Sequence, residues 1–169
     1  MIFVSLVIEI AIICCKGCAR RVPLNYILLL TFTVCQSFVF GVITSMYTAE
    51  SVLMAAGMTL GMTFALTLYA CTTKTDFTAC GALFFTLSIG MMALMALSFF
   101  MTFAEWWYPV LSALLLVFYG LFLIYDTQMV LGGGKHELTY DDYIVGALIL
   151  YVDIMMIFLE LLKIFGSSN

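Results

Sequence analysis

Hydrophobic positions along the chain form six long continuous stretches instead of alternating with polar positions. The stretches cover residues 2–15, 22–45, 51–71, 77–103, 107–131 and 140–165. All except the first exceed the roughly 20 residues that a helix needs to span hydrocarbon, whereas a barrel strand needs only about 10 alternating residues. We therefore predict an all-α integral membrane protein, a bundle of six spans in one domain of residues 1–169. The first span, at about 14 residues, is marginal.

Short polar connections separate these stretches, so consecutive helices are expected to be antiparallel. Gly132, Gly133 and Gly134 suit the C-terminal end of a helix. Thr139, with Asp142 three residues later, resembles a capping box, so we expect the last helix to begin near Thr139.

Basic residues occur in alternate connections, which predicts the orientation of the bundle in the membrane. The first, third and fifth connections hold Lys16, Arg20, Arg21, Lys74 and Lys135, and the second and fourth hold none. By the positive-inside rule, the odd connections face the cytosol and residue 1 lies on the opposite side.

Composition narrows the class of protein further. Hydrophobic residues make up 65% and charged residues 9% of the 169 positions, too few charges to cover the surface of a soluble domain. The net charge of −4, without a basic patch, argues against nucleic acid as a partner. The expected partner is the lipid bilayer.

Small residues recur every four positions at Gly57, Gly61 and Ala65. This spacing places them on one helix face, where two backbones can approach closely. We interpret that face as a helix-packing surface.

Four acidic residues, Glu9, Asp126, Asp153 and Glu160, lie inside apolar stretches. Each central Asp costs about 2.5 to 3.5 kcal/mol on insertion scales, so these side chains are expected to face the protein interior. Asp126 and Asp153 lie on consecutive antiparallel helices and can face each other. Their depths, counted from the connection between them, differ by about 13 Å at 1.5 Å per residue, so the pairing needs a tilted or late-starting last helix.

These acids have few matching bases, since Lys163 is the one Lys or Arg within a predicted span. Unmatched acids can be neutralised by protons, by a bound metal cation or by water. Glu160 can instead pair with Lys163 or extend toward the membrane surface, and Glu9 can lie at a partly exposed helix end.

Several sequence motifs resemble the transmembrane Bax inhibitor motif family, in its lifeguard and glutamate-receptor-associated branch. They occur in the family's order and cover essentially the whole chain. The motifs are Val22-Pro-Leu-Asn25, Ser45-Met-Tyr-Thr-Ala-Glu50, Thr73-Lys-Thr-Asp-Phe-Thr78, Tyr125-Asp-Thr-Gln128 with Leu131-Gly-Gly133, and Tyr151-Val-Asp-Ile154.

The resemblance implies a seven-helix fold with a cytosolic N-terminus, so the family's first helix is expected to be missing here. It implies a pH-regulated calcium leak in the endoplasmic reticulum, the Golgi or the plasma membrane, with effects on calcium stores and cell death. Asp126 and Asp153 match the family's proton sensor and gate, where calcium is the transported or bound ion. Glu160 and Glu9 are secondary candidates for pore acids. No enzyme activity and no other cofactor is expected.

Two other function classes stay open. One is a non-conducting, anti-apoptotic protein that binds membrane proteins of cell-death signalling. The other is an intramembrane aspartyl protease, because two aspartates on adjacent helices could activate a water. Tyr125-Asp126 resembles half of the presenilin signature, but Asp153 lacks the preceding Gly-x-Gly and the chain has no Pro-Ala-Leu motif.

Overall fold

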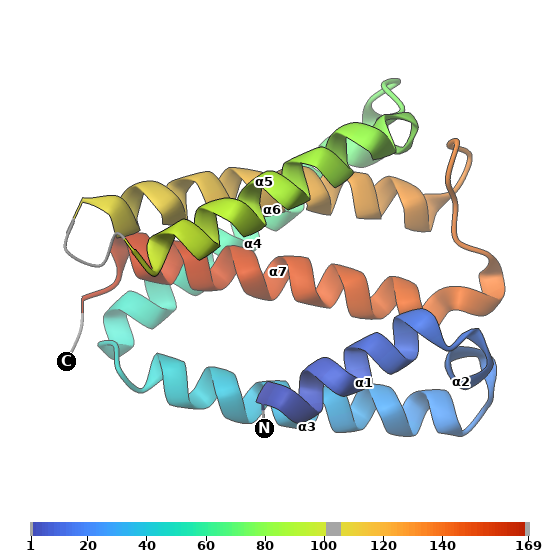
Figure 1. The fold of residues 1–169 in the computed structure, drawn as a ribbon, viewed down its shortest axis with the longest axis horizontal. Coiled ribbons are helices and arrows are strands. Elements are labelled where there is room, and N and C mark those ends of the chain that lie inside the picture. Colours follow the sequence, from blue (N-terminus) through green and yellow to red (C-terminus); the bar gives the residue numbers. More distant parts are fainter. Residues whose placement is uncertain (1, 101–105, 168–169) are drawn as a thin grey trace.

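The computed structural model describes residues 2–100 and 106–167, without the side chains of Ile2, Lys16 and Cys18. All of its regular elements in these ranges are helices (Figure 1). The α-helices are α1 (Ile2–Cys14), α2 (Lys16–Arg20), α3 (Leu24–Thr44), α4 (Ala49–Thr72), α5 (Gly81–Ser98), α6 (Trp107–Leu131) and α7 (Tyr143–Phe165). Two 3-10 turns, η1 (Phe77–Cys80) and η2 (Tyr140–Asp142), lead into α5 and α7.

Five of the described helical segments are long and apolar enough to cross a membrane, which confirms the all-α membrane fold. They are Leu24–Thr44, Ala49–Thr72, Phe77–Ser98, Trp107–Leu131 and Tyr140–Phe165. The first predicted span is shorter. At 13 residues α1 extends about 20 Å, less than the ~30 Å thickness of hydrocarbon. The fourth predicted span is helical as far as Ser98, and positions 101–103 lie outside the described residues.

Helix α7 is the central element of the bundle. On one side it packs against α4 and α6 through Leu123, Ile157 and Leu162, which are almost fully buried (Figure 1). On the other side it packs against α1 and α3, with Phe32 and Leu148 fully buried. Helix α5 packs mainly on α6. In a bilayer such contacts are stabilised by close packing, because lipid tails are as apolar as the side chains.

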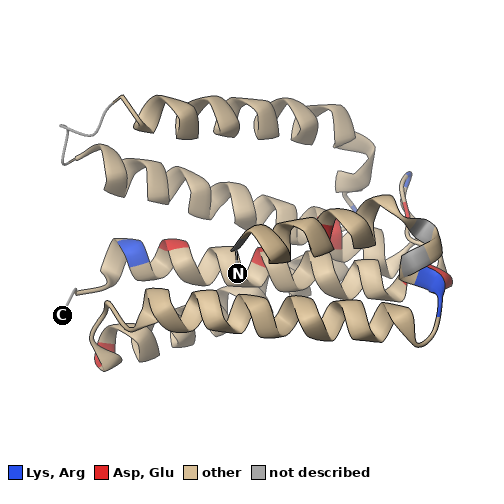
Figure 2. Ribbon diagram, turned by 60° about the horizontal axis from the view of Figure 1, so that its bottom comes forward, with Lys and Arg blue, Asp and Glu red and all other residues tan. Residues whose placement is uncertain are grey.

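The connections that hold most basic residues all lie at one end of the bundle. The α1–α3, α4–α5 and α6–α7 connections meet there, while the α3–α4 turn and the C-terminal end of α7 lie at the other end (Figures 1 and 2). Consecutive long helices are therefore antiparallel, as the short connections indicate. Lys163 lies near the opposite end of the bundle. Because it forms an ion pair with Glu160, it counts less toward the difference in positive charge between the two ends.

The predicted packing role of Gly57 and Gly61 is wrong for the contacts within this chain. Both glycines and Ala65 are exposed, and a Cβ at either glycine would meet nothing within 4 Å. Helix α4 turns another face, with Ala55 and Thr59 buried, toward its neighbours. Beside these small residues, Met58, Met62 and Leu66 of α4 pack against the cluster formed with α6 and α7.

The close approaches between helices occur at other glycines. A Cβ on Gly120 of α6 would lie 3.1 Å from Cε of Met62 on α4. A Cβ on Gly146 of α7 would lie 3.1 Å from Cγ2 of Val130 on α6. These two positions let α6 approach both of its main neighbours.

The C-terminal end of α6 agrees with the end predicted from the sequence, whereas the start of α7 differs from the predicted start. Helix α6 ends at Leu131, and Gly132 and Gly133 adopt φ of 76° and 83°, which favours glycine. The predicted capping box at Thr139 forms only in part. The Asp142 carboxylate lies within hydrogen-bonding reach of the Thr139 backbone N–H. The Thr139 hydroxyl, however, donates to Asp142 Oδ2 at 3.0 Å and accepts from no backbone amide of the described helix.

Candidate functional site

The candidate site lies where α6 and α7 pack most closely. Asp126 of α6 and Asp153 of α7 are 9% and 5% exposed. Their carboxyl groups lie within hydrogen-bonding reach of each other across the helix interface. A hydrogen bond between two carboxyl groups needs a proton on one of them, because two ionised carboxylates are both acceptors. The structure thus brings together the two aspartates that the sequence singles out.

The residue at which α7 begins explains how Asp126 and Asp153 come to lie at similar depths in the bundle. Helix α7 begins at Tyr143, after the η2 turn, so Asp153 lies ten residues into it, fewer than a start at Thr139 would give. The connection also folds back along α6, since the amide of Leu138 donates to the carbonyl oxygen of Met129 at 3.0 Å. Both features reduce the expected difference in depth.

Among the described residues, neither aspartate has a cationic partner. The ion pairs of the described residues involve Asp142 and Glu160, on other turns. One oxygen of Asp153, Oδ2, is buried without a hydrogen-bond partner. Burying an unpaired carboxylate is costly, so the pair can keep at most a small net charge unless a cation or water joins it.

Asp153 also lines a cavity of about 260 Å³ on the α5 side of the bundle. Ser88 and three methionines of α5 form one wall, and Tyr119 and Phe122 of α6 form the other. Asp153 therefore borders open space on the α5 side, in addition to its packed contacts with α6.

Glu160 differs from the pair because it has a base. Its Oε1 accepts from Lys163 Nζ at 2.7 Å, as the spacing in the sequence allows. Its other oxygen is buried without a partner. Tyr119 lies within electrostatic range of both Glu160 and Asp153, so the two acids share one neighbourhood along α6.

Glu9 lies away from this neighbourhood. It is half-buried on α1 and lines a separate groove between α1, α3 and α7. The structure does not place it with Asp126 and Asp153.

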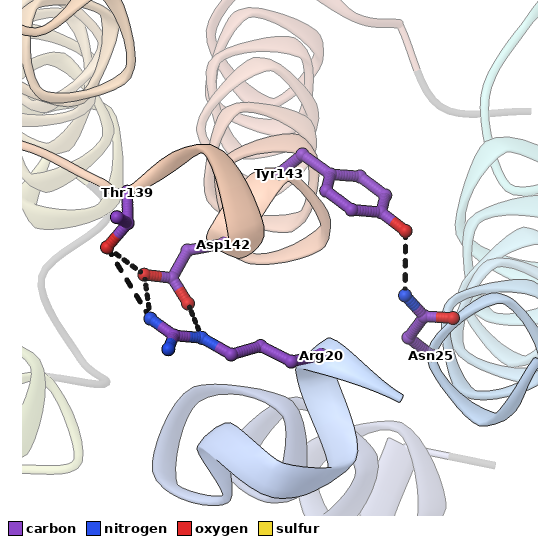
Figure 3. Close-up of polar contacts among 5 residues, drawn as sticks. All are labelled: Arg20, Asn25, Thr139, Asp142 and Tyr143. Carbon is purple, nitrogen blue, oxygen red and sulfur yellow. Dashed lines mark hydrogen bonds and ion pairs between the residues drawn. The ribbon is translucent and has the colours of Figure 1, made fainter. Parts of the chain in front are cut away.

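Figure 3 shows a polar clamp at the basic end of the bundle. Arg20 of α2 binds Asp142 with two hydrogen bonds, Nε to Oδ1 and Nη2 to Oδ2, both 2.8 Å long. Beside it, Asn25 of α3, fully buried, donates to the Tyr143 hydroxyl at 2.9 Å. The clamp holds the first helices against the start of α7, the helix that positions Asp153.

A second polar cluster joins the α4–α5 connection to the end of α6. Gln128 lies two residues beyond Asp126; it accepts from the amide of Phe77 at 2.8 Å and donates to the carbonyl of Thr75 at 3.0 Å. Asp76 Oδ2 accepts from the amide of Lys135 at 3.1 Å. These bonds fix the connections around the end of α6 that holds Asp126.

Sequence reasoning missed the clamp and the cluster as functional elements. Arg20, Asp76 and Asp142 lie in connections, where charged residues are ordinary. The signal available was that Asn25, Asp76 and Gln128 fall inside motifs of the resembled family, which a surface role alone does not explain.

The pair by itself does not make a resident calcium site. Calcium takes six to eight oxygen ligands, and two carboxylates supply four at most. In the described part of the chain no three His, Cys, Asp or Glu side chains are placed to hold a metal. A calcium ion at the pair would therefore keep several waters.

Comparisons with known proteins relate this chain to one family. A family model described as "Inhibitor of apoptosis-promoting Bax1" matches residues 1–169. Protein lifeguard 3 from Mus musculus and from Homo sapiens are 40% and 37% identical over 98% of this chain. Protein lifeguard 4 from Mus musculus is 36% identical over 87% of it.

The chain covers 55%, 54% and 60% of those three proteins, so it spans little more than half the length of these relatives. The match over the full chain, the helical membrane fold and the order of the motifs all agree. The chain belongs to the Bax inhibitor motif family.

Proposed function

We propose that this chain forms a calcium leak whose opening is governed by the protonation of Asp126 and Asp153. The observation that supports it is a pair of carboxyl groups within hydrogen-bonding reach of each other, buried between α6 and α7, with no ion pair to a base among the described residues. We place the leak in the endoplasmic reticulum, the Golgi or the plasma membrane, where it would adjust calcium stores and thereby cell death.

The magnitude of charge repulsion is sufficient for gating. When one proton is shared, the hydrogen bond holds α6 against α7. When that proton leaves, two like charges about 4 Å apart repel by about 4 kcal/mol at an effective dielectric constant of 20. Conformations of a protein typically differ by a few kcal/mol, so losing one proton can shift the population toward an open arrangement.

The cavity beside Asp153 supports a path for the ion. It adjoins the pair on the α5 side, where Ser88 and Tyr119 supply hydroxyl groups. Helix α5 packs mainly on α6 and adds no residue to the buried cluster between α4, α6 and α7, so it can move with little disruption of that cluster. A hydrated cation attracted by the ionised pair would enter from this side.

A flux assay tests the proposal. The full chain is reconstituted in liposomes loaded with a calcium-sensitive dye, and dye signal after calcium addition is compared with protein-free liposomes. We expect wild-type flux above that background and a several-fold change in Asp126→Asn. Asp141→Asn, an exposed neutralisation in the adjacent connection, is the matched control and should behave as wild type. Wild-type flux equal to background, or equal flux in Asp126→Asn and wild type, would refute the leak.

A second candidate function is a non-conducting membrane protein that binds a cell-death partner. The family description, which names apoptosis-promoting Bax1, favours it. This alternative predicts that a pure liposome shows no flux at any pH while the folded chain still protects cells. Protection retained by the Asp126→Asn, Asp153→Asn double variant would support this alternative over the leak.

A further inference from the structure

A groove on the side of α7 away from the aspartate pair has no role in the proposed leak. It lies between α1, α3 and α7 and has a volume of about 220 Å³. Its walls are mainly apolar, with Val39, Phe40 and Ile43 of α3 facing Met155 and Leu159 of α7. The groove borders the half of α3 that the short α1 leaves uncovered (Figure 1).

The apolar groove is lined by one carboxylate, that of Glu9 of α1. Among the described residues no side chain forms an ion pair or a hydrogen bond with Glu9. The lining residues include no Lys, Arg or His. Their polar side chains include those of Gln36 and Ser5, which are uncharged. Helix α1 ends at Cys14, five residues past Glu9, and the described basic side chains of Arg20 and Arg21 lie beyond it at the end of the bundle.

The chemistry of the groove selects its ligand. A carboxylate in apolar surroundings is stabilised by a cation that can donate hydrogen bonds. The apolar walls do not supply the six to eight oxygens that calcium needs, so a bare metal ion fits poorly. The volume is below the roughly 300 to 1,000 Å³ of pockets for drug-sized molecules, which favours a narrow alkyl chain over a ring system.

A second copy of the chain does not supply the missing cation. Within the five long spans, the described basic side chain is Lys163, and it is already bound to Glu160. A copy that docked its apolar face here would bury Glu9 without neutralising it.

We propose that the groove binds a lipophilic amine, a molecule with one alkyl chain and a protonated amino group that pairs with Glu9. The alkyl chain lies along the apolar walls of α3 and α7 and leaves through the side open to lipid. The site is independent of the leak, because it uses neither Asp126 nor Asp153.

Binding of dodecylamine to the full chain in phosphatidylcholine nanodiscs tests this site. Dodecanol, neutral and of equal chain length, and empty nanodiscs measure simple partitioning into lipid. We expect a saturable component for dodecylamine alone, with a Kd weakened about tenfold or more in Glu9→Gln, as expected for loss of a hydrogen bond to a charged group. Glu50→Gln removes an equal charge from the exposed first turn of α4 and should leave the Kd unchanged.

A second variant separates loss of the site from loss of the fold. Val39→Trp fills the groove and should abolish the saturable component while the unfolding temperature stays near that of wild type. The proposal is overturned by equal dodecylamine binding in wild type and Glu9→Gln, or by dodecanol competing as well as the amine. It is also overturned if native mass spectrometry shows a second copy, or cross-linking a preceding segment of a longer chain, filling the groove.

Discussion

Acidic side chains in this bundle fall into two kinds according to their partners. Glu160 and Asp142 are buried with a bound base, Lys163 or Arg20. Asp126 and Asp153 have each other and no base. A bound base favours the ionised form of an acid, whereas a pair that shares a proton changes its charge with pH. The second kind is therefore the better candidate for a switch.

The Arg20–Asp142 clamp should contribute measurably to stability. Arg20 is partly exposed, but Asp142 is mostly buried and both hydrogen bonds are 2.8 Å long. A double-mutant cycle of Arg20→Ala and Asp142→Ala, read from unfolding in detergent, should give a favourable coupling free energy, because the pair is bidentate and one partner has little exposed surface. Arg21→Ala, in the exposed neighbour, should change stability little. A coupling near zero would show that the clamp does not hold α2 to α7.

The contact between Asp76 and Lys135 should weaken in acid. Hydrogen bonds from the Thr78 hydroxyl and from backbone amides, including that of Lys135, lower the pKa of Asp76 below its ordinary value of 3.8. The folded contact thus favours the ionised form, so its stabilisation is present above the ordinary pKa and is lost as pH falls through the lowered one.

Hydrogen exchange measures this loss directly. The protection factor of the Lys135 amide should fall as pH drops below about 4, while that of the Leu138 amide, bound to the Met129 carbonyl, should not. Asp76→Asn should remove the pH dependence at Lys135. Parallel behaviour of both amides in wild type would contradict the assignment.

At the scale of the elements, small residues matter where two helices are held close by their neighbours. Gly120 and Gly146 occupy such positions, and Gly57 and Gly61 do not. A four-residue spacing of glycines identifies a face that could pack, but the sequence alone does not say which face a neighbouring helix covers. That choice depends on the summed fit of all side chains on α4, α6 and α7, which is a property of the bundle.

Substitution of Gly120 should therefore destabilise the bundle more than substitution of Gly57. Val at position 120 would press against Met62 and Leu66 of α4, an overpacking that typically costs about 1 to 3 kcal/mol. Gly57→Val adds the same side chain to a helix interior with open space around it. Thermal unfolding in one detergent should show a lower Tm for Gly120→Val than for Gly57→Val. Equal values would mean that α4 and α6 do not approach at Gly120.

At the scale of the whole molecule, the apolar stretches predict the spans and their antiparallel order, because lipid allows few alternatives to helices. The same reasoning places Asp126 and Asp153 inside the protein, since an acid facing lipid is costly. The clamp at Arg20 and the cluster at Gln128 and Asp76 could not be predicted in this way. Their partners are more than 50 positions apart in the sequence, and only the folded connections bring them together.

We propose that the shared proton of Asp126 and Asp153 keeps the leak closed. The most direct test of this claim is the pH profile of calcium flux in dye-loaded liposomes, from about pH 6 to about pH 8, for wild type, Asp126→Asn and Asp153→Asn. We predict that wild-type flux rises with pH, as the pair loses its shared proton, and that both variants lose most of this slope. A flat wild-type profile, or the wild-type slope retained in both variants, would contradict the claim.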